Sequence, residues 1–256
     1  MARVLITGSA DGLGLLAGRR LLAEGHQVVL HARNDRRADD TRAAAPGAEA
    51  VLVGDLASIE ETRALAGQAT AAGPFDAVIH NAGAGYGDRR RQSTVDGLAL
   101  VYAVNVLAPY LLTALLPKPA RLVYLSSGMH LGGDPDLGDL QWERKRWHGT
   151  QAYSDSKLLD AVLAFAVARR WPSVRSNAVD PGWVPTRMGG RGAPDDLEQG
   201  VLTQTWLATS DDPAAAVTGR YFYHRQQRDT HPAASDPAVQ DGLLAACAKL
   251  TGVDFP

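Results

Sequence analysis

The feature that most constrains this chain is a glycine-rich turn directly after its first apolar segment. Residues 2–8 read ARVLITG and are rich in aliphatic and β-branched side chains, which predicts a strand. Residues 7–14 then read TGSADGLG, and apolar side chains at helical spacing continue to about residue 25. Glycines at such a junction allow positive φ, and the first turn of a helix presents unpaired N–H groups to an anion. The sequence therefore predicts a pyrophosphate-binding turn, against the alternative of a glycine turn without a ligand.

Six more apolar segments follow, and helical patterns separate most of them. They cover residues 26–33, 49–56, 75–83, 120–127, 173–182 and 219–225. Strands separated by helices predict an α/β fold with one doubly wound parallel sheet of about seven strands, flanked by helices. The length of 256 residues suits one domain spanning 1–256, and the polar tail after residue 225 is expected to lie over the surface.

The composition excludes several classes of protein. With 26 basic and 28 acidic side chains, the chain has no basic excess with which to bind nucleic acid or an anionic membrane. Its single cysteine, Cys247, cannot form an internal disulfide or a thiolate-rich zinc site. We therefore expect a cytoplasmic protein without a metal site, in which Cys247 is a buried structural residue rather than a nucleophile.

One segment, residues 98–116, carries no charge and is about long enough to span a bilayer. Asn105 lies near its middle and Pro109 follows one turn later, which favours a buried helix of a globular domain over a membrane span. An unsatisfied amide inside that helix would cost on the order of 1–3 kcal/mol. Asn105 therefore either serves the site, for example by holding a water near Lys157, or kinks the helix and bonds to backbone; both can hold together.

The second predicted strand ends without the carboxylate that dinucleotide-binding folds usually place there for the ribose 2′-hydroxyl. It ends in LHARN, and Arg33 stands where a 2′-phosphate would lie. Arginine suits phosphate through its charge and bidentate geometry, so the sequence favours NADP(H) over NAD(H). Asp11 adds negative charge and argues the other way, and the alternative for Arg33 is a solvated charge. The candidate cofactor contacts of these two turns are Gly8, Ser9, Asp11, Gly12, Leu13, Gly14, Arg33 and Asn34.

A phenol and an ammonium stand four residues apart in YSDSK, residues 153–157. On a helix, Tyr153 and Lys157 project from the same face, and the ammonium lowers a phenol pKa that is ordinarily about 10. Such a tyrosine can exchange a proton with a carbonyl or an alcohol near neutral pH, whereas the alternative is an exposed helical pair. Ser126 and Ser127 end the fifth predicted strand, at the edge where open α/β sheets bind ligands, and a hydroxyl there can hydrogen-bond a substrate oxygen.

Taken together, these motifs resemble the short-chain dehydrogenase/reductase family in order and register, from residue 3 to about 224. They are TGSADGLG (7–14), Asp55-Leu56, HNAG (80–83), Asn105, SS (126–127), YSDSK (153–157) and DPGWVPT (180–186). The resemblance implies a Rossmann-type fold in which Asn105, Ser127, Tyr153 and Lys157 form a catalytic tetrad. Tyr153 would be the acid/base, Lys157 would bind the nicotinamide ribose and lower the pKa of Tyr153, and Ser127 would orient the substrate oxygen.

The same resemblance implies further cofactor contacts and a quaternary structure. Asp55 and Leu56 would contact the adenine region. The residues implied to line the rest of the cofactor are Asn81, Ala82, Gly83, Pro181, Gly182, Val184 and Thr186. A homodimer or homotetramer would pack through the helices around residues 98–116 and 152–170.

The chain departs from the family pattern at two places. His80 stands where the family usually has Asn, and the gap of 26 residues between Ser127 and Tyr153 is longer than usual. The insertion, at about 131–150, resembles the retinol-dehydrogenase-like branch, which largely prefers NADP(H) and handles bulky apolar carbonyls. Its Trp142 and Trp147 either wall a substrate pocket or pack the insertion onto the domain.

Three further features are interpreted from their surroundings in the sequence. His130 follows Ser127 closely, and we expect backbone atoms to satisfy it, with substrate contact as the alternative. Asp134, Asp136 and Asp139 lack further ligands in a cation-binding pattern and are expected to form a solvated loop. The segment at about 183–205, rich in glycine, is expected to be a lid over the substrate.

The residues and the resemblance together predict an NADP(H)-dependent oxidoreductase that interconverts a carbonyl and an alcohol on a small molecule. One alternative keeps the fold and reduces a C=C bond. Another is a regulator that senses NADPH without turnover, although such a protein would be expected to lose members of the tetrad. The substrate itself and the direction of the reaction are not encoded in any motif.

Overall fold

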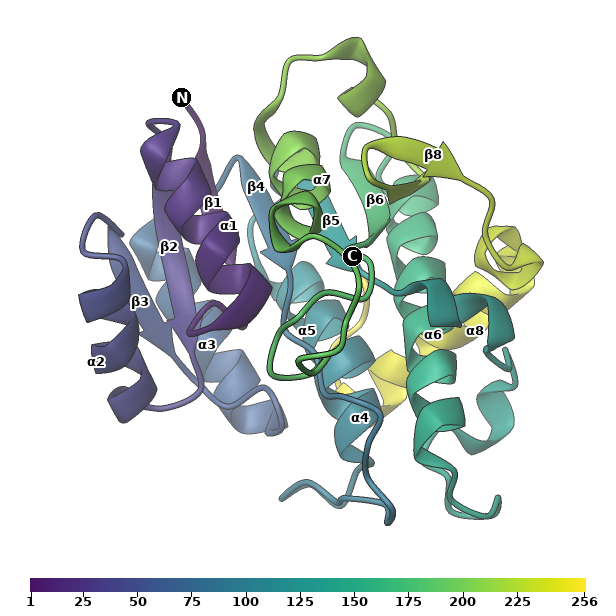
Figure 1. Cartoon of the computed structure of the whole chain (residues 1–256). Coiled ribbons are helices and arrows are strands. Elements are labelled where there is room, and N and C mark those ends of the chain that lie inside the picture. Colours follow the sequence, from purple (N-terminus) through teal and green to yellow (C-terminus); the bar gives the residue numbers. More distant parts are fainter.

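A mostly parallel sheet of eight strands forms the centre of the structure, a computed structural model that describes residues 1–256 (Figure 1). The strand order is β3-β2-β1-β4-β5-β6-β7-β8, so the winding reverses beside β1, as in a doubly wound sheet. Only the last pair, β7 and β8, is antiparallel. The strands are β1 (Arg3–Ile6), β2 (Gln27–Ala32), β3 (Ala50–Val53), β4 (Ala77–His80), β5 (Arg121–Leu125), β6 (Arg175–Asp180), β7 (Tyr221–Tyr223) and β8 (Gln226–Arg228).

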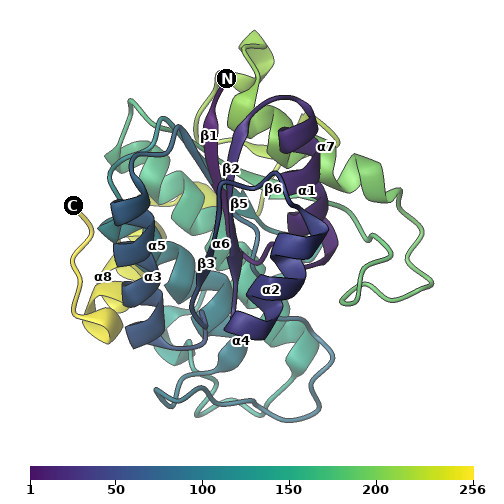
Figure 2. The ribbon, with the colours of Figure 1, turned by 90° about the vertical axis from the view of Figure 1, so that its left-hand side faces the viewer.

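Helices cover both faces of this sheet, as the edge-on view in Figure 2 shows. One face carries α1 (Gly12–Ala23), α2 (Asp35–Ala44) and α7 (Leu197–Thr209). The other carries α3 (Ile59–Ala72), α5 (Ala108–Leu115), α6 (Gly149–Arg170) and α8 (Pro237–Thr251). The short helices are α4 (Leu100–Tyr102), the π-helix η1 (Ala103–Leu107), and the 3₁₀ helices η2 (Gly128–Gly132), η3 (Leu137–Asp139), η4 (Pro213–Ala215) and η5 (Pro232–Ser235).

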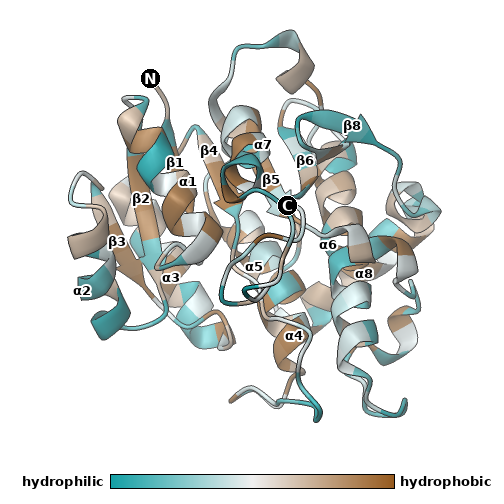
Figure 3. Ribbon diagram, in the orientation of Figure 1, coloured by the Kyte–Doolittle hydropathy of each residue, from teal (hydrophilic) through white to brown (hydrophobic).

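Two apolar cores, one on each face, hold the layers together. A parallel sheet is covered on both sides, so its strands read as nearly continuous apolar runs rather than alternating patterns. Val4 and Ile6 of β1 join the core beneath α1 and α7, whereas Leu5 between them joins the core beneath α5 and α6. Figure 3 shows the apolar colour concentrated in the strands and the inner helix faces.

All seven predicted strands are present, and the predicted α/β fold class is confirmed. The eighth strand, β8, was not predicted, because its three residues are Gln, Gln and Arg and all are exposed. The hairpin that creates it turns at His224 and Arg225, which adopt positive φ of 48° and 61°. Such turns usually contain glycine or asparagine, so the sequence carries no hairpin signal at this point.

The expectation that the tail after residue 225 merely lies over the surface is wrong. The tail forms α8, which packs against both α5 and α6 and buries Leu243, Leu244 and Cys247. The hydroxyl of Tyr102 lies 3.4 Å from the Cys247 sulfur, and burial raises the pKa of this thiol to about 12. Cys247 is therefore the buried structural cysteine that the sequence predicts.

The uncharged segment 98–116 is buried, as expected, but it is not one continuous α-helix. It runs through α4, a π-helix at residues 103–107, and α5, with Asn105 inside the π-helix. No helix of this protein has the length and apolar character needed to cross a bilayer. The insertion at 131–150 contains the end of η2, all of η3, the loops around them and the start of α6.

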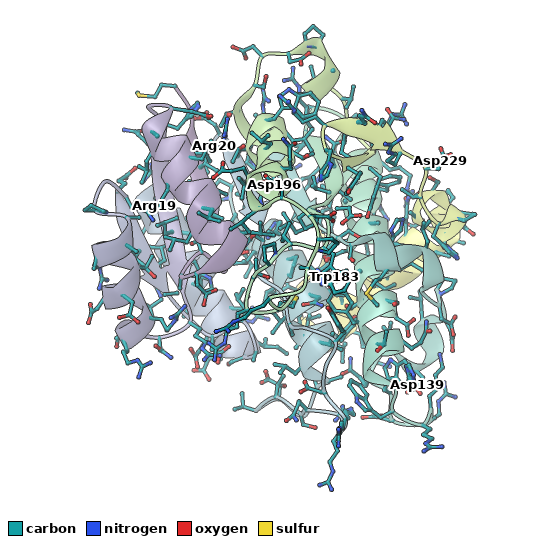
Figure 4. All side chains as sticks on the ribbon, in the orientation of Figure 1. Arg19, Arg20, Asp139, Trp183, Asp196 and Asp229 are labelled. Carbon is teal, nitrogen blue, oxygen red and sulfur yellow. The ribbon has the colours of Figure 1, made fainter.

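The segment expected to be a lid, 183–205, divides at Asp196. Residues 197–205 belong to α7, whose Val201 and Leu207 are buried in the core beneath α1. Only residues 183–196 form a loop, which curls in front of the sheet between Trp183 and Asp196 (Figure 4). Any lid must therefore consist of this shorter loop, because α7 is part of the packed domain.

Candidate active site

The glycine turn is built so tightly that side chains are excluded from it. Gly8 has a φ of 61°, and a Cβ on it would lie 2.6 Å from the Cα of Ala82. The side-chain nitrogen of Asn81 donates to the carbonyls of Thr7 and Gly8, each at 3.0 Å, and the backbone N of Ala82 donates to the Thr7 hydroxyl. The turn thus forms a cradle of bare backbone at the N-terminus of α1, a geometry that suits a dinucleotide pyrophosphate.

Ser9 and His31 fasten this turn to the neighbouring strand. The Ser9 hydroxyl donates to the Ile6 carbonyl at 2.8 Å and accepts from the backbone N of His31 at 2.7 Å. The His31 ring accepts from the Gly8 backbone N at 2.9 Å and donates to the Gly54 carbonyl at 2.7 Å. Burial lowers the pKa of His31, which keeps the ring in the neutral form these two bonds require. The side chains of Ser9 and His31 therefore fix the backbone of the glycine turn through hydrogen bonds.

Two arginines lie at the end of β2. Arg33 is exposed and has no ion-pair partner. Arg37, on the first turn of α2, is bound to the Asp11 carboxylate at 2.6 Å and to the Ala10 carbonyl at 3.2 Å. Asn34 caps α2 by accepting from the Arg37 backbone N at 3.0 Å. Arg37 therefore offsets the negative charge of Asp11 beside the glycine turn.

Asp55 and Leu56 follow β3 at the same edge of the sheet. The backbone N of Asp55 donates to Glu61 at 2.7 Å, while its carboxylate accepts from the backbone N of Ala57 at 2.9 Å. Leu56 is buried in the core beneath α3. Both residues are therefore held rigidly at the carboxyl ends of the strands.

Tyr153 lies in the first turns of α6, where only 6% of its surface is exposed. Its ring makes an edge-on contact with Tyr86, with ring centroids 5.2 Å apart. Burial raises the pKa of Tyr153, while the charge of Lys157 and the hydroxyl of Ser127 lower it by less. The effect of Lys157 has the expected sign, but in this structure the pKa of Tyr153 remains above its ordinary value because desolvation dominates.

The two serines after β5 have different tasks. The Ser126 hydroxyl is buried and donates to the backbone carbonyl of Lys157 at 2.7 Å, so it joins β5 to α6. The Ser127 hydroxyl is half-buried and accepts only from the backbone N of Met129, at 3.3 Å. The same hydroxyl is near enough to Tyr153 to lower the pKa of the phenol, so Ser127 and Tyr153 are neighbours.

Lys157 is buried at the carboxyl end of β5. Its ammonium donates to the Leu125 carbonyl at 2.6 Å and to the Asp160 carboxylate at 2.8 Å. The nitrogen lies 5.8 Å from the centre of the Tyr153 ring. The phenol and the ammonium are thus neighbours on one helix face, as the four-residue spacing predicts.

Asn105 joins three elements. Its side chain accepts from the backbone N of Ala84 at 2.7 Å and donates to the Ala84 carbonyl at 3.2 Å and to the Ser156 hydroxyl at 2.9 Å. A Cβ on Gly83 would lie 3.6 Å from the Asn105 side-chain oxygen and 3.8 Å from the Lys157 nitrogen. The amide is therefore satisfied, and Asn105 and Lys157 approach Gly83 together.

The loop after β6 returns to the glycine turn. A Cβ on Gly12 would lie 3.7 Å from a side-chain carbon of Thr186, and Val184 is buried beside it. Gly182 adopts a φ of 84°, and its backbone N donates to Asp180 at 2.9 Å. Pro181 precedes this glycine at the carboxyl end of β6. This loop therefore continues the edge that carries the expected cofactor contacts.

Aromatic side chains from the insertion lie beside Tyr153. Trp142 and Trp147 contact each other edge-on, 5.6 Å apart, and pack against the small cluster that contains Tyr153. The Trp147 ring N donates to the Asp88 carbonyl at 3.0 Å, which ties the insertion to the segment after β4. The two tryptophans thus pack the insertion onto the domain at a place that also borders the site.

Two other polar residues of this region, His130 and Asp139, are satisfied by contacts inside the protein. The His130 ring bonds to the Ser127 carbonyl at 2.8 Å and stacks on Tyr221, so the backbone interpretation holds. Asp139, labelled in Figure 4, is buried and accepts from three backbone N–H groups at residues 143–145. The expectation of a solvated aspartate trio is therefore wrong for Asp139, which organises the turn.

The doubly wound sheet and the bare glycine cradle at the N-terminus of α1 are typical of proteins that bind a dinucleotide. The family model described as short chain dehydrogenase matches residues 2–128. An uncharacterized oxidoreductase of Emericella nidulans is 45% identical, and the alignment covers 100% of this chain and 99% of that protein. The chain therefore belongs to the short-chain dehydrogenase/reductase family, whose members are oxidoreductases that bind a nicotinamide cofactor and act on small molecules.

More distant relatives and a solved structure agree with this assignment. A Streptomyces sp. protein with the provisional name daunorubicin C-13 ketoreductase is 32% identical over 97% of this chain and 92% of its own. Retinol dehydrogenase 13 of Homo sapiens is 27% identical over 99% and 85%. A crystal structure of an uncharacterized protein from Mycobacterium paratuberculosis superposes with a TM-score of 0.86 at 28% identity, over 100% of this chain and 95% of that one.

Four residues that the structure brings to the site are not indicated by the sequence motifs. They are His31, Arg37, Tyr86 and Asp160. The spacing of Lys157 and Asp160, three residues apart on a helix, carried a usable signal for an ion pair. The other three depend on loop conformation and strand order, which no local pattern specifies.

Proposed function

We propose that this protein is an NADP(H)-dependent oxidoreductase that interconverts a carbonyl and an alcohol, with Tyr153 as the acid/base. The observation that carries the proposal is the placement of the Tyr153 phenol beside the buried Lys157 ammonium at the carboxyl edge of the sheet. A phenol in that position can hold a proton at neutral pH and give it to a substrate oxygen. The provisional name of the Streptomyces relative, a ketoreductase, also supports carbonyl reduction.

The cofactor would lie along the edge from the glycine turn to Lys157. The residues that would hold it are Gly8, Ser9, Asp11, Gly12, Leu13, Gly14, Arg33, Asn34, Asp55, Leu56, Asn81, Ala82, Gly83, Tyr153, Lys157, Pro181, Gly182, Val184 and Thr186. NADP(H) is favoured because the Arg33 guanidinium at the end of β2 is exposed and has no ion-pair partner, while Arg37 offsets the charge of Asp11. When bound, NADPH supplies the hydride.

The chain's own residues handle the proton and the substrate oxygen. In reduction, Tyr153 transfers its hydroxyl proton to the carbonyl oxygen as the C=O group becomes CH–OH. The Ser127 hydroxyl donates a hydrogen bond to that oxygen while negative charge develops on it. Lys157 stabilises the phenolate that Tyr153 becomes, since an ammonium beside a phenolate favours the charged form. Tyr86, Trp142 and Trp147 border the site and favour an apolar substrate.

The decisive variant is Tyr153→Phe, which removes one hydroxyl and keeps the ring contact with Tyr86. We expect a loss of turnover of roughly 100-fold or more with little change in NADPH affinity, because general acid–base catalysis contributes about that much. Turnover is followed by NADPH consumption, and affinity by NADPH fluorescence. Tyr223→Phe is the matched control, because it also removes one phenol hydroxyl but its ring stacks on His224 instead of contacting Tyr86.

A panel of ketones, aldehydes and enones, each with NADPH and NADH, separates the proposal from its rivals. Reduction confined to enones would indicate a C=C reductase, and tight NADPH binding with no turnover of any compound would indicate a sensor. A clear preference for NADH would refute the role of Arg33. Full activity in Tyr153→Phe would refute the role of Tyr153.

A further inference from the structure

A second buried charge lies beside Lys157 and has no part in the expected tetrad. Asp160 stands one helical turn after Lys157 on α6, and the side chains of both are 4% exposed. The Lys157 nitrogen lies 2.8 Å from the Asp160 carboxylate. Burying such a pair costs desolvation energy that an apolar pair would not. A stable helix does not need this arrangement, which points to a use for the pair at the site.

The contacts of the ammonium show how Asp160 constrains it. An ammonium has three N–H donors, and the Leu125 carbonyl and the Asp160 carboxylate occupy two of them. The backbone carbonyl of Lys157 is also held, by the Ser126 hydroxyl. One N–H donor remains unused. The Lys157 nitrogen that carries it lies beside Gly83, since a Cβ built on this glycine would be 3.8 Å from it.

Electrostatics explains why a carboxylate is needed. Burial alone lowers the pKa of Lys157, because a low-dielectric interior disfavours the ammonium, but Asp160 opposes this and the pKa is raised overall. Burial in turn raises the pKa of Asp160 to about 6, against the effect of Lys157. Other titratable groups near Asp160 are Tyr153 on α6, Tyr124 on β5 and Tyr221 on β7, each with a raised pKa. Above pH 7, therefore, Asp160 is the anion that keeps Lys157 charged.

We propose that Asp160 is a positioning residue that holds the Lys157 ammonium charged and fixed, with its one free donor available at the cofactor edge. The inference rests on the proposed function for the use of that donor. The ion pair itself can be tested in the protein without cofactor or substrate.

The test replaces Asp160 with asparagine, which keeps the shape and one acceptor oxygen but removes the charge. Asp155→Asn is the matched control, because Asp155 is also a buried carboxylate on α6 but binds the Asp134 backbone and Gln151 instead of Lys157. Without its counter-charge, Lys157 should become neutral in the folded protein and stay charged in the unfolded one. Stability is then lost as pH falls below the unfolded lysine pKa of about 10.4.

We therefore expect the Tm of Asp160→Asn, relative to wild type, to fall progressively from pH 9.5 to 7.5, while Asp155→Asn shows no such trend. This window lies above the titration of Asp160 in the wild type. The double variant Lys157→Met/Asp160→Asn should melt higher than Asp160→Asn at pH 7.5, since it removes the stranded amine. If Asp160→Asn folds poorly, recovery of the folded state in the double variant gives the same answer.

Two further readouts connect the ion pair to the site. NADPH should bind Asp160→Asn at least about tenfold more weakly, a change of about 1.4 kcal/mol, by fluorescence titration. In alcohol oxidation, the rise of kcat with pH should move to higher pH by about one unit, because a neutral Lys157 no longer lowers the pKa of Tyr153. Neither shift is expected in Asp155→Asn.

The proposal is overturned if Asp160→Asn and Asp155→Asn share the same pH dependence of Tm, or if the double variant is no more stable than Asp160→Asn. An active Tyr153→Phe combined with the expected melting behaviour would instead refute the proposed function and leave the ion pair intact. The two failures are therefore distinguishable.

Discussion

At the scale of single residues, burial keeps the imidazole of His80 neutral, and this links the stability of the protein to pH. His80 donates or accepts one bond, to Thr113 at 3.1 Å, and its ring lies 4.7 Å from that of Tyr124. Complete burial lowers the pKa of His80 to about 3. This residue stands where the family usually has asparagine, so it adds a pH dependence that an asparagine would not.

His80→Asn should therefore change how stability depends on pH. The folded pKa of His80 is lowered below the unfolded value of about 6.5, so its neutral state supports the fold above that pH and the support is lost as pH falls toward 3. Relative to the variant, wild type should lose about 1.4 kcal/mol of unfolding free energy per pH unit below about 6.5. Urea unfolding between pH 4.5 and 7.5 measures this slope. Parallel curves for the two proteins would contradict it.

At the scale of elements, the site depends on two irregular segments. The π-helix at residues 103–107 places Asn105 so that its amide reaches Ala84, in the loop after β4, and Ser156 on α6. The glycine turn brings backbone within contact of Asn81 and Ala82, where a Cβ would not fit. Both irregular segments lie at the carboxyl edge of the sheet, where the cofactor is expected to bind.

Gly8→Ala tests the glycine turn. Its φ of 61° and the 2.6 Å approach to the Ala82 backbone mean that even a methyl group must displace the segment that follows β4. We expect a loss of at least about 1–2 kcal/mol in unfolding free energy from the backbone alone, with NADPH affinity also reduced. Gly67→Ala is the control, because it lies within α3 with nothing near its Cβ position, and it should be neutral or stabilising by up to about 1 kcal/mol. Unchanged NADPH affinity in Gly8→Ala would contradict the assignment of this turn.

At the scale of the whole molecule, the C-terminal helix decides which surfaces are free. α8 covers parts of α5 and α6, the helices through which the resemblance implies a homodimer or homotetramer. Tyr110 and Trp171 also bond to the end of the chain, through the carbonyls of Val253 and Pro256. The faces of α5 and α6 that α8 covers are therefore not available to a second copy of the chain while α8 is packed there. A partner would have to bind another surface.

Removing residues 236–256 should expose those faces. The two buried leucines of α8, Leu243 and Leu244, contribute on the order of 3–6 kcal/mol, so we expect a marked loss of stability together with self-association. Size-exclusion chromatography with light scattering compares the truncated and intact chains. Dimers of the intact chain that dissociate on truncation would contradict this assignment of α8.

Much of the fold and of the candidate site was predictable because the signals are local. Each parallel strand is a short apolar run, the cradle is a cluster of glycines at one junction, and Tyr153 and Lys157 share a helix face through their spacing alone. The missed elements lack such signals. β8 is a run of exposed polar residues behind a hairpin without glycine, and α8 is recognisable as a core element only from what it covers.

The amino-acid sequence alone was enough to predict the class of fold, the glycine turn expected to bind a pyrophosphate and the side chains proposed to react, since each depends on residues adjacent in the chain or one helical turn apart. Tertiary structure alone decided how those groups are held. It bonded Ser126 to α6 and placed Ser127 near Tyr153, satisfied Asn105 through Ala84, and paired Arg37 with Asp11. It also buried Lys157 with Asp160, so that their charges act across a low-dielectric interior. Burial and long-range contact set these properties, and neither can be read from spacing along the chain.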